Sequence, residues 1–400
     1  MKRLLKSLKI CCILALLNMI GSISHAQDSF TVNHGGTSQQ NYFTKVDYEN
    51  VVGKIILKAT IRGKEYRFVL DTGAPNAISQ ALLNELNPPL ITKMPIWDIS
   101  NKVDSLSVVS LSGISIGNVI FNDIPTVVPK EQFIFECLGV DGFIGSNMLR
   151  NSILQISSNT QKIVITDQVE TLKLNNQHAS DLFLTKPQSS PIFESTILNT
   201  TTANIPLLFD TGSPKLMDIA LAHYAFCEKE PIFNLQAKSV GNNAFGIHGP
   251  GGDTTQYLLQ IPGLNINGTV LNNITAQTVI SDDSIVGTEL LKYGVVTVDY
   301  MHKKFYFEPF KAKNDAATKS FPIAFIPQNN KVVIGIIWDE QLRSKVSIND
   351  QLLAINDVDY TNISACDFIL KSKQYEGLSE AKLTLKSPEG KLKKVTISKR

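Results

Sequence analysis

The feature that most constrains this 400-residue chain is an apolar strand sequence that runs into Asp-Thr-Gly and occurs twice. The first copy spans residues 68–74 and contains Asp71, and the second spans residues 207–213 and contains Asp210. One such sequence after a strand is ordinary turn chemistry. Two copies 139 residues apart indicate instead a duplication of domain size, rather than a short structural repeat.

Downstream matches at nearly the same spacing support this duplication. Gly145 follows two apolar residues in the first half, and Gly287 follows two apolar residues in the second half, 142 residues later. After each glycine we expect a short helical turn and then a pair of strands. The expected strands are residues 153–156 and 162–165, then 295–298 and 304–307. The chain is therefore predicted to contain two lobes built on one plan.

The paired aspartates suggest a chemistry that needs both of them. Two carboxyls held close together cannot both ionise at low cost, so they share one proton. If Asp71 and Asp210 form such a dyad, one carboxyl can activate a water that attacks an amide carbonyl. The other carboxyl then donates to the developing oxyanion.

The residues after each aspartate suit two loops that meet. Glycine lets the two backbones approach closely, and threonine hydroxyls can brace the loops across the interface. The expected supporting residues are Thr72, Gly73, Thr211, Gly212 and Ser213 around the dyad, with Gly145 and Gly287 behind it.

With these residues the chain resembles the aspartic proteases, in the form that carries both lobes on one polypeptide. Ile-Gly-x-x-x-Leu at residues 144–149 and Val-Gly-x-x-Leu-Leu at residues 286–291 resemble the retropepsin-like version more than pepsin. The resemblance covers residues 51–309 approximately. It implies β-barrel lobes related by a pseudo-twofold axis, and a peptide or protein substrate. We expect no cofactor. Ala74 stands where many pepsins have serine, and retroviral enzymes share the alanine.

The resemblance also implies a flap hairpin in residues 92–107. No tyrosine occurs between Asp71 and Asn151, so the flap tyrosine of pepsin has no counterpart. Trp97 could replace it and contact the substrate, or it could pack in the core or lie on the surface. In the second half, the glycine-rich residues 241–252 suggest a mobile loop over a cleft.

The last eighty or so residues are expected to form another module. Its expected elements are strands at 323–326 and 332–337, a helix at about 364–371 and a hairpin around 388–390. Residues 349–356 resemble the Gly-Asp-x-Ile-x-x-Ile-Asn sequence of PDZ domains, with Asn349 and Asp357 at glycine positions where φ is positive. Ala324 replaces a glycine of the family's carboxylate-binding loop. Capture of a peptide end, regulation and simple packing all stay open as roles.

The N-terminus has the pattern of a secretory signal peptide. Four basic residues within residues 2–9 precede an apolar run, residues 10–20, and small residues precede a cut after Ala26. The run is too short to span a bilayer, and an amphipathic membrane anchor is the alternative. No other segment approaches spanning length. We expect a protein exported to the periplasm or secreted.

Charge and cysteines limit other functions. Removing residues 1–26 takes away four basic residues and no acidic one, which turns the net charge of +2 into −2 and gives no footprint for nucleic acid. No His-Glu-x-x-His sequence occurs, so no metal is expected. The cysteines that remain are Cys137, Cys227 and Cys366. Their odd number favours buried thiols, or one bridge such as Cys137 to Cys227.

These observations predict a mainly β chain with two protease-type lobes and a PDZ-like α+β module. The expected divisions are a signal peptide at 1–26, a flexible leader at 27–46, lobes at 47–168 and 191–310, a linker at 169–190 and the module at 319–400. The predicted function is an exported aspartic endopeptidase that acts as a monomer. The alternative is a catalytically silent, peptide-binding envelope protein built on the same lobes.

Overall fold

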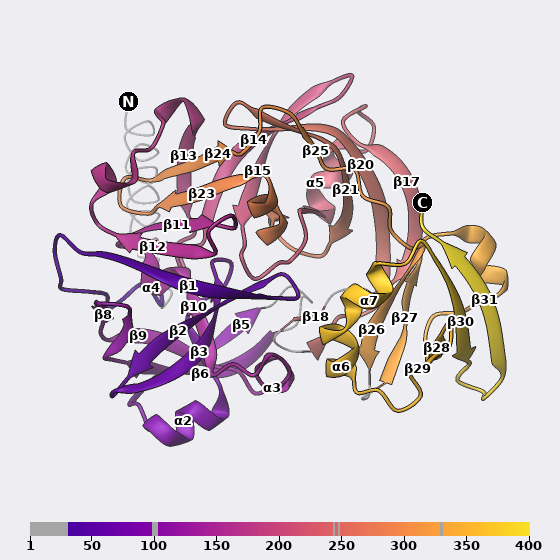
Figure 1. Cartoon of the computed structure of the whole chain (residues 1–400), viewed down its shortest axis with the longest axis horizontal. Coiled ribbons are helices and arrows are strands. Elements are labelled where there is room, and N and C mark those ends of the chain that lie inside the picture. Colours follow the sequence, from indigo (N-terminus) through magenta and orange to yellow (C-terminus); the bar gives the residue numbers. More distant parts are fainter. Residues whose placement is uncertain (1–30, 98–102, 243–244, 247–248, 329–330) are drawn as a thin grey trace, which may run out of the picture. The chain divides into compact units, whose positions relative to one another are not determined.

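A computed structural model describes residues 31–97, 103–242, 245–246, 249–328 and 331–400 (Figure 1). The predicted signal peptide, the flap tip and parts of the glycine-rich loop lie outside the described residues. Strands dominate the rest, so the prediction of a mainly β fold is confirmed. Within the described ranges, no helix is long and apolar enough to cross a membrane.

The first lobe is a set of hairpins closed by a strand that returns beside the first Asp-Thr-Gly sequence. Its elements are β1 (Phe43–Val51), β2 (Lys54–Ile61), β3 (Lys64–Asp71), β4 (Ala77–Ile78), α2 (Gln80–Leu86), β5 (Leu90–Trp97), β6 (Val103–Leu111), β7 (Ile114–Ile116), β8 (Val119–Phe121), β9 (Ile124–Val128), α3 (Phe133–Leu138), β10 (Gly142–Gly145), α4 (Ser146–Leu149), β11 (Ile153–Ser157) and β12 (Lys162–Thr166). Arg62 and Gly63 both have positive φ, which suits the tight β2–β3 turn. Parallel pairing then places Gly145 of β10 beside Asp71.

The second lobe repeats this plan. Its elements are β14 (Pro191–Leu198), β15 (Thr202–Phe209), β16 (Met217–Ala220), α5 (Leu221–Cys227), β17 (Asn234–Gly241), β18 (Phe245–Gly246), β19 (Gly249–Pro250), β20 (Thr254–Ile266), β21 (Thr269–Val279), β22 (Ser284–Val286), η3 (Thr288–Lys292), β23 (Gly294–Asp299) and β24 (Lys304–Pro309). Strand β15 pairs in parallel with β22, as β3 does with β10. A short helical turn and a hairpin follow, as they do in the first lobe, so the sequence repeat is a repeat of structure.

One sheet joins the two lobes, in the strand order β1, β12, β11, β23, β24, β13. Its centre is the antiparallel pair β11–β23, where Ile153 lies opposite Asp299. Strand β13 (Ala179–Leu184) follows η1 (Val169–Leu172) and η2 (Asn176–His178), all within the predicted linker. This part of the linker is therefore ordered. Residues 179–181 pair with β24 in the shared sheet, and Leu182, opposite Phe193 of β14, is buried despite its polar surroundings.

The predicted flexible leader is also more ordered than its composition suggests. Val32 is 2% exposed, and its carbonyl accepts a hydrogen bond from the side chain of Asn147 at 3.1 Å. Strand β1 already begins at Phe43. Buried Val32 and Tyr42 hold this segment together with hydrogen bonds to side chains elsewhere in the chain, such as Asp167 and Arg150, and none of these leaves a periodic signal in a polar sequence.

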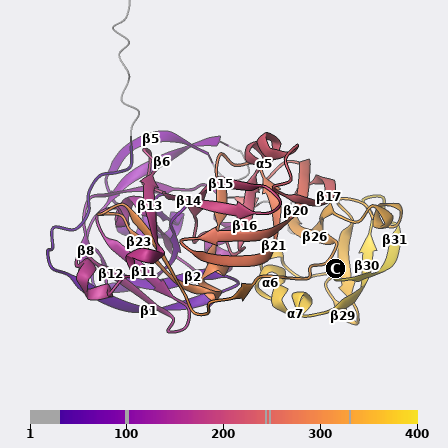
Figure 2. The ribbon, with the colours of Figure 1, turned by 90° about the horizontal axis from the view of Figure 1, so that it is seen from above.

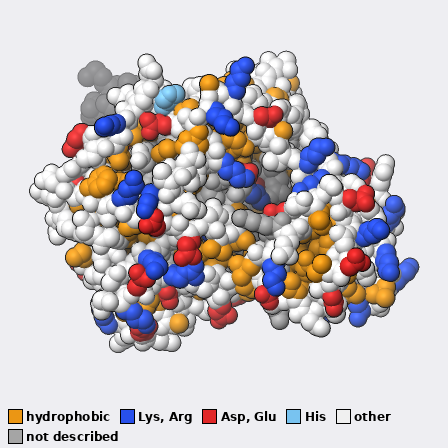
Figure 3. All heavy atoms as spheres, in the orientation of Figure 1, with side chains coloured by type: hydrophobic (Ala, Val, Ile, Leu, Met, Phe, Trp, Pro, Cys, Tyr) orange, Lys and Arg blue, Asp and Glu red, His pale blue; other side chains and the backbone are white. Residues whose placement is uncertain are grey.

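The C-terminal module has its own sheet and apolar core. After β25 (Asn314–Asp315), which pairs with β21, its elements are β26 (Ile323–Gln328), β27 (Lys331–Ile337), η4 (Glu340–Ser344), β28 (Gln351–Ile355), β29 (Val358–Asp359), α6 (Ala365–Leu370), α7 (Ser372–Glu376), β30 (Glu380–Lys386) and β31 (Leu392–Ser398). Asn349 has the positive φ expected of it, whereas at the second turn Asn356, not Asp357, does. Figure 3 shows basic side chains along the edge formed by β30 and β31.

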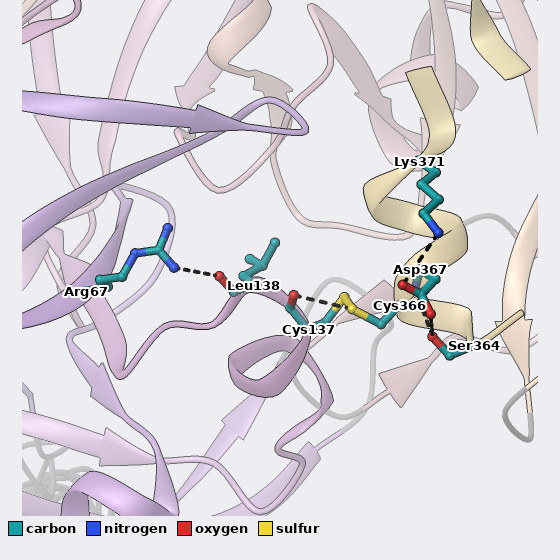
Figure 4. Close-up of a disulfide and its surroundings, with 7 residues drawn as sticks. All are labelled: Arg67, Cys137, Leu138, Ser364, Cys366, Asp367 and Lys371. Carbon is teal, nitrogen blue, oxygen red and sulfur yellow. Dashed lines mark hydrogen bonds and ion pairs between the residues drawn. A yellow bond between two sulfur atoms is a disulfide. The ribbon is translucent and has the colours of Figure 1, made fainter. Parts of the chain in front are cut away.

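The module is fastened to both lobes. Its Cys366 in α6 forms a disulfide with Cys137 in α3 (Figure 4), which corrects the suggested Cys137–Cys227 bridge and leaves Cys227 free. Strand β27 lies beside β17 of the second lobe (Figure 1), where the backbone N–H of Asn242 donates to the carbonyl of Gly335 at 2.8 Å. Figure 2 shows β26 of the module near β17 in the view from above. Sequence spacing could not identify the bridge because its two cysteines belong to different folding units.

Candidate active site

Two equivalent strands deliver the two aspartates to one place. Strand β3 ends at Asp71, and β15 ends one residue before Asp210. A methyl group added to Gly73 would lie 2.5 Å from the carboxyl carbon of Asp210, and one added to Gly212 would lie 2.5 Å from Oδ2 of Asp71. Each glycine therefore leaves the space that the carboxyl of the opposite lobe fills.

Reciprocal hydrogen bonds tie the two loops together. The backbone N–H of Thr72 donates to Oγ1 of Thr211 at 3.0 Å, and the N–H of Thr211 donates to Oγ1 of Thr72 at 3.0 Å. Each hydroxyl then donates further, from Thr72 to the carbonyl of Phe209 at 2.6 Å and from Thr211 to that of Leu70 at 2.8 Å. Both threonines are fully buried. These four bonds fix the distance between the strands that carry the aspartates.

A second pair of contacts supports the loops from behind. A side chain on Gly145 would come within 2.3 Å of the backbone at Pro75 and Asn76, and one on Gly287 within 2.3 Å of the Ser213 carbonyl. The next residue in each lobe donates its N–H to the loop, from Ser146 to Ala74 at 3.2 Å and from Thr288 to Ser213 at 2.8 Å. The residues that support the two loops in this way are Ala74, Pro75, Asn76, Ser146, Ser213 and Thr288.

The two carboxyls are close enough to act on each other and are partly accessible to solvent. Burial, the charge of Asp210 and the hydrogen bond to it raise the pKa of Asp71 to about 7. Burial also raises the pKa of Asp210, whereas Lys54, the N–H of Gly212 and the hydrogen bond from Asp71 act to lower it. Both carboxyls therefore hold a proton more tightly than a free aspartate does, and the pair titrates as a unit.

Four residues at the site were not identified from the sequence. The Lys54 ammonium donates a hydrogen bond to the carbonyl of Gly212, and the Gln188 side-chain amide donates one to the carbonyl of Gly73 at 2.8 Å. The hydroxyl of Ser146 donates to the carbonyl of Thr72 at 2.7 Å and bonds the hydroxyl of Tyr300 at 2.8 Å. The fourth residue, Ser190, is 3.3 Å from the carbonyl of Gly73. Only Ser146 had a visible signal, since it and Thr288 are hydroxyl residues at matching places.

The structure gathers most of the predicted site residues. Asp71, Asp210 and their two Thr-Gly pairs meet, and Ser213 N–H donates to the carbonyl of Asp210 at 3.1 Å. The flap hairpin is present as β5 and β6. Trp97 ends β5, but its side chain lies outside the described residues, so its contact with substrate stays a prediction. In the described part of the chain no cluster of His, Cys, Asp or Glu could hold a metal ion.

Comparison with known proteins gave matches to a family model and to solved structures. The family model described as aspartyl protease matches residues 57–148, which include the first Asp-Thr-Gly loop and Gly145. Basic 7S globulin from soybean is 10% identical over 66% of this chain and 94% of its own, with a TM-score of 0.39. A retropepsin-like aspartic protease from Rickettsia conorii is 16% identical over 31% of this chain and 89% of its own, with a TM-score of 0.23. Among curated proteins no sequence matches the chain.

Proposed function

We propose that this chain is an aspartic endopeptidase in which Asp71 and Asp210 activate water. One observation carries the proposal: two carboxyls from equivalent loops meet, and reciprocal threonine bonds hold those loops together. A purely structural role would not explain two acids side by side, because two carboxylates at this spacing repel each other. A shared proton is what acid–base catalysis of peptide hydrolysis requires.

The raised pKa values of Asp71 and Asp210 favour a dyad that carries one shared proton. The carboxyl that holds the proton is the proposed acid, and the ionised carboxyl is the proposed base. The base takes a proton from the water while the water oxygen attacks the scissile carbonyl, and the acid donates its proton to the developing oxyanion. Collapse of this intermediate breaks the C–N bond, and the amine leaves with a proton returned from the dyad.

The test is digestion of a mixed peptide library by the mature protein. The wild type is expected to cut peptides at internal bonds, and Asp71→Asn and Asp210→Asn are each expected to abolish nearly all cutting. The double variant should be little worse than either single one, because the carboxyls act as a unit. Asp181→Asn, at an exposed carboxylate that pairs with Lys304, is the matched control.

Two outcomes would decide against the proposal. A folded wild type that leaves the whole library uncut favours the silent peptide-binding protein. If either single variant keeps more than about a tenth of the wild-type rate, equivalent to roughly 1.4 kcal/mol of barrier, the shared-proton mechanism is wrong.

Export is the proposed location of this activity. The basic and apolar pattern of residues 1–26 is that of a signal peptide. The disulfide between Cys137 and Cys366 supports the proposal, because such bonds form and persist in oxidising compartments. Detection of a mature N-terminus at Gln27 in a periplasmic or culture-medium fraction would test it.

For the C-terminal module we propose a bracing role. Phe325 of β26 packs edge-on against Phe368 of α6 and against Tyr375, each at 5.8 Å between ring centres. These contacts join β26 to α6, the two elements between which a PDZ-like module would accept a peptide strand. The bonds to both lobes support bracing instead. Titration with peptides that end in free apolar carboxyl termini should therefore give no binding.

A further inference from the structure

The two loops of the candidate site are not chemically equivalent. The β2–β3 and β14–β15 hairpins can be aligned on the residue two positions before each aspartate, together with the residue that pairs with it on the neighbouring strand. These opposed pairs are Ile56 with Val69 and Ile192 with Leu208. By this register, Lys54 in the first lobe is equivalent to Ser190 in the second. The Ser190 hydroxyl is 3.3 Å from the carbonyl of Gly73, and the Lys54 ammonium donates to the carbonyl of Gly212. The same place therefore holds a neutral donor in one lobe and a cation in the other.

The backbone that carries Lys54 is held against the second lobe. The carbonyl of Gly53 accepts a hydrogen bond from Thr288 Oγ1 at 2.6 Å, and its N–H donates to the side chain of Asn50 at 3.0 Å. Gly53 has a φ of 86°, and a side chain on it would lie 2.5 Å from Cβ of Pro214. Lys54 is itself partly buried. Its ammonium is thus anchored by its own backbone as well as by the Gly212 carbonyl.

Few charges act on the dyad. The two carboxyls act on each other, and Lys54 lowers the pKa of both. The N–H groups of Gly73 and Gly212 also favour the ionised forms, but they are neutral. The next basic residue in the second loop is Lys215, whose ammonium pairs with Asp218 at 3.1 Å. Lys54 is therefore the cation placed to offset the negative charge of the dyad.

We propose that Lys54 is a positioning residue of this site. Its ammonium, which is hydrogen-bonded to the Gly212 carbonyl, offsets the negative charge of the dyad and so sets the pH range over which the dyad carries one charge. This inference rests on the proposed function and deepens it. Removing an opposite charge this close to an acid makes that acid hold its proton more tightly. Loss of the cation therefore moves both ionisations of the dyad to higher pH.

The main test is the pH profile of kcat/KM for peptide cleavage. Lys54→Met is expected to shift the acid limb to higher pH by about one unit or more, with the alkaline limb moving in the same direction. Lys54→Arg keeps the charge and should keep both limbs in place. Lys58→Met is the matched control, since it removes an exposed lysine of the same strand that pairs with Glu65. An equal loss of activity at every pH, or unmoved limbs in Lys54→Met, would overturn the proposal.

A second measurement keeps this inference separate from the proposed function. In protein labelled with ¹³C at the aspartate carboxyls, Asp71→Asn and Asp210→Asn assign the two signals, which can then be titrated in the wild type and in Lys54→Met. The titration midpoints should rise in Lys54→Met whether or not any peptide is cut. If the wild type cuts nothing but these midpoints rise, only the proposed function fails. If the midpoints do not move, the role of Lys54 fails.

Discussion

Replacing Asp71 by asparagine should stabilise this protein above neutral pH. Burial and the neighbouring carboxyl raise the pKa of Asp71 from 3.8 to about 7, so the folded state holds this proton more tightly than the unfolded chain does. The tighter binding of this proton stabilises the folded state below about pH 4, and this stabilisation is lost as the pH rises through 7. Asparagine keeps the acceptor for the Gly73 N–H, which is 3.1 Å from Oδ1 of Asp71, but carries no charge.

The expected size of the effect follows from that change in pKa. A rise from 3.8 to about 7 corresponds to on the order of 4 kcal/mol between protonated and ionised states. Because Asp210 and Lys54 also respond to the substitution, we expect Asp71→Asn to gain about 1–4 kcal/mol at pH 8. At pH 4, where the wild-type carboxyl keeps its proton, the two proteins should be nearly equal.

Urea unfolding at a series of pH values between 4 and 8 measures this difference directly. Asp47→Asn, at an exposed carboxylate that pairs with Lys162, is the control and should show no comparable gain with pH. Catalytic activity plays no part in the measurement. If Asp71→Asn is no more stable than the wild type at pH 8, or if its advantage does not grow as the pH rises, the assignment of the raised pKa to Asp71 is wrong.

Three further predictions concern the support of the site. Thr72→Val and Thr211→Val should each cost about 1–3 kcal/mol of unfolding free energy in urea unfolding, because each leaves a buried N–H unpaired; the two substitutions remove different bonds, and a cost near zero for either one would contradict the reciprocal bonds. Cys366→Ser should lower stability by about 2–4 kcal/mol, whereas Cys227→Ser should leave it nearly unchanged in the same assay. A chain ending at Thr318 should fold and still cut short peptides, since the module has a separate apolar core; circular dichroism and peptide digestion would check both points, and an unfolded product would show that the lobes need the module.

The repeated strand sequences were sufficient to predict the two-lobe plan. Both Asp-Thr-Gly loops follow an apolar strand, and both lobes use glycine where a returning strand passes behind the loop. These features are local in sequence and occur twice, so each copy supports the other. The meeting of Asp71 with Asp210 followed from the duplication, because equivalent strands in related lobes end at equivalent places.

Features without a repeat or a local pattern were missed. Lys54 has no basic counterpart in the second lobe, and the start of a strand is an ordinary place for a lysine. The leader is held by the buried side chain of Val32, and strand β13 is held by pairing with a strand far along the chain. Such contacts depend on tertiary structure, and residue type and spacing within one segment cannot predict them.

The disulfide changes how the chain is connected. Cys137 and Cys366 are 229 positions apart, and the whole second lobe lies between them. The backbone and the bridge thus form one closed covalent ring. A single peptide bond cut anywhere in residues 138–365 would open this ring without releasing a fragment, so the two pieces would remain one molecule until a reductant broke the bridge.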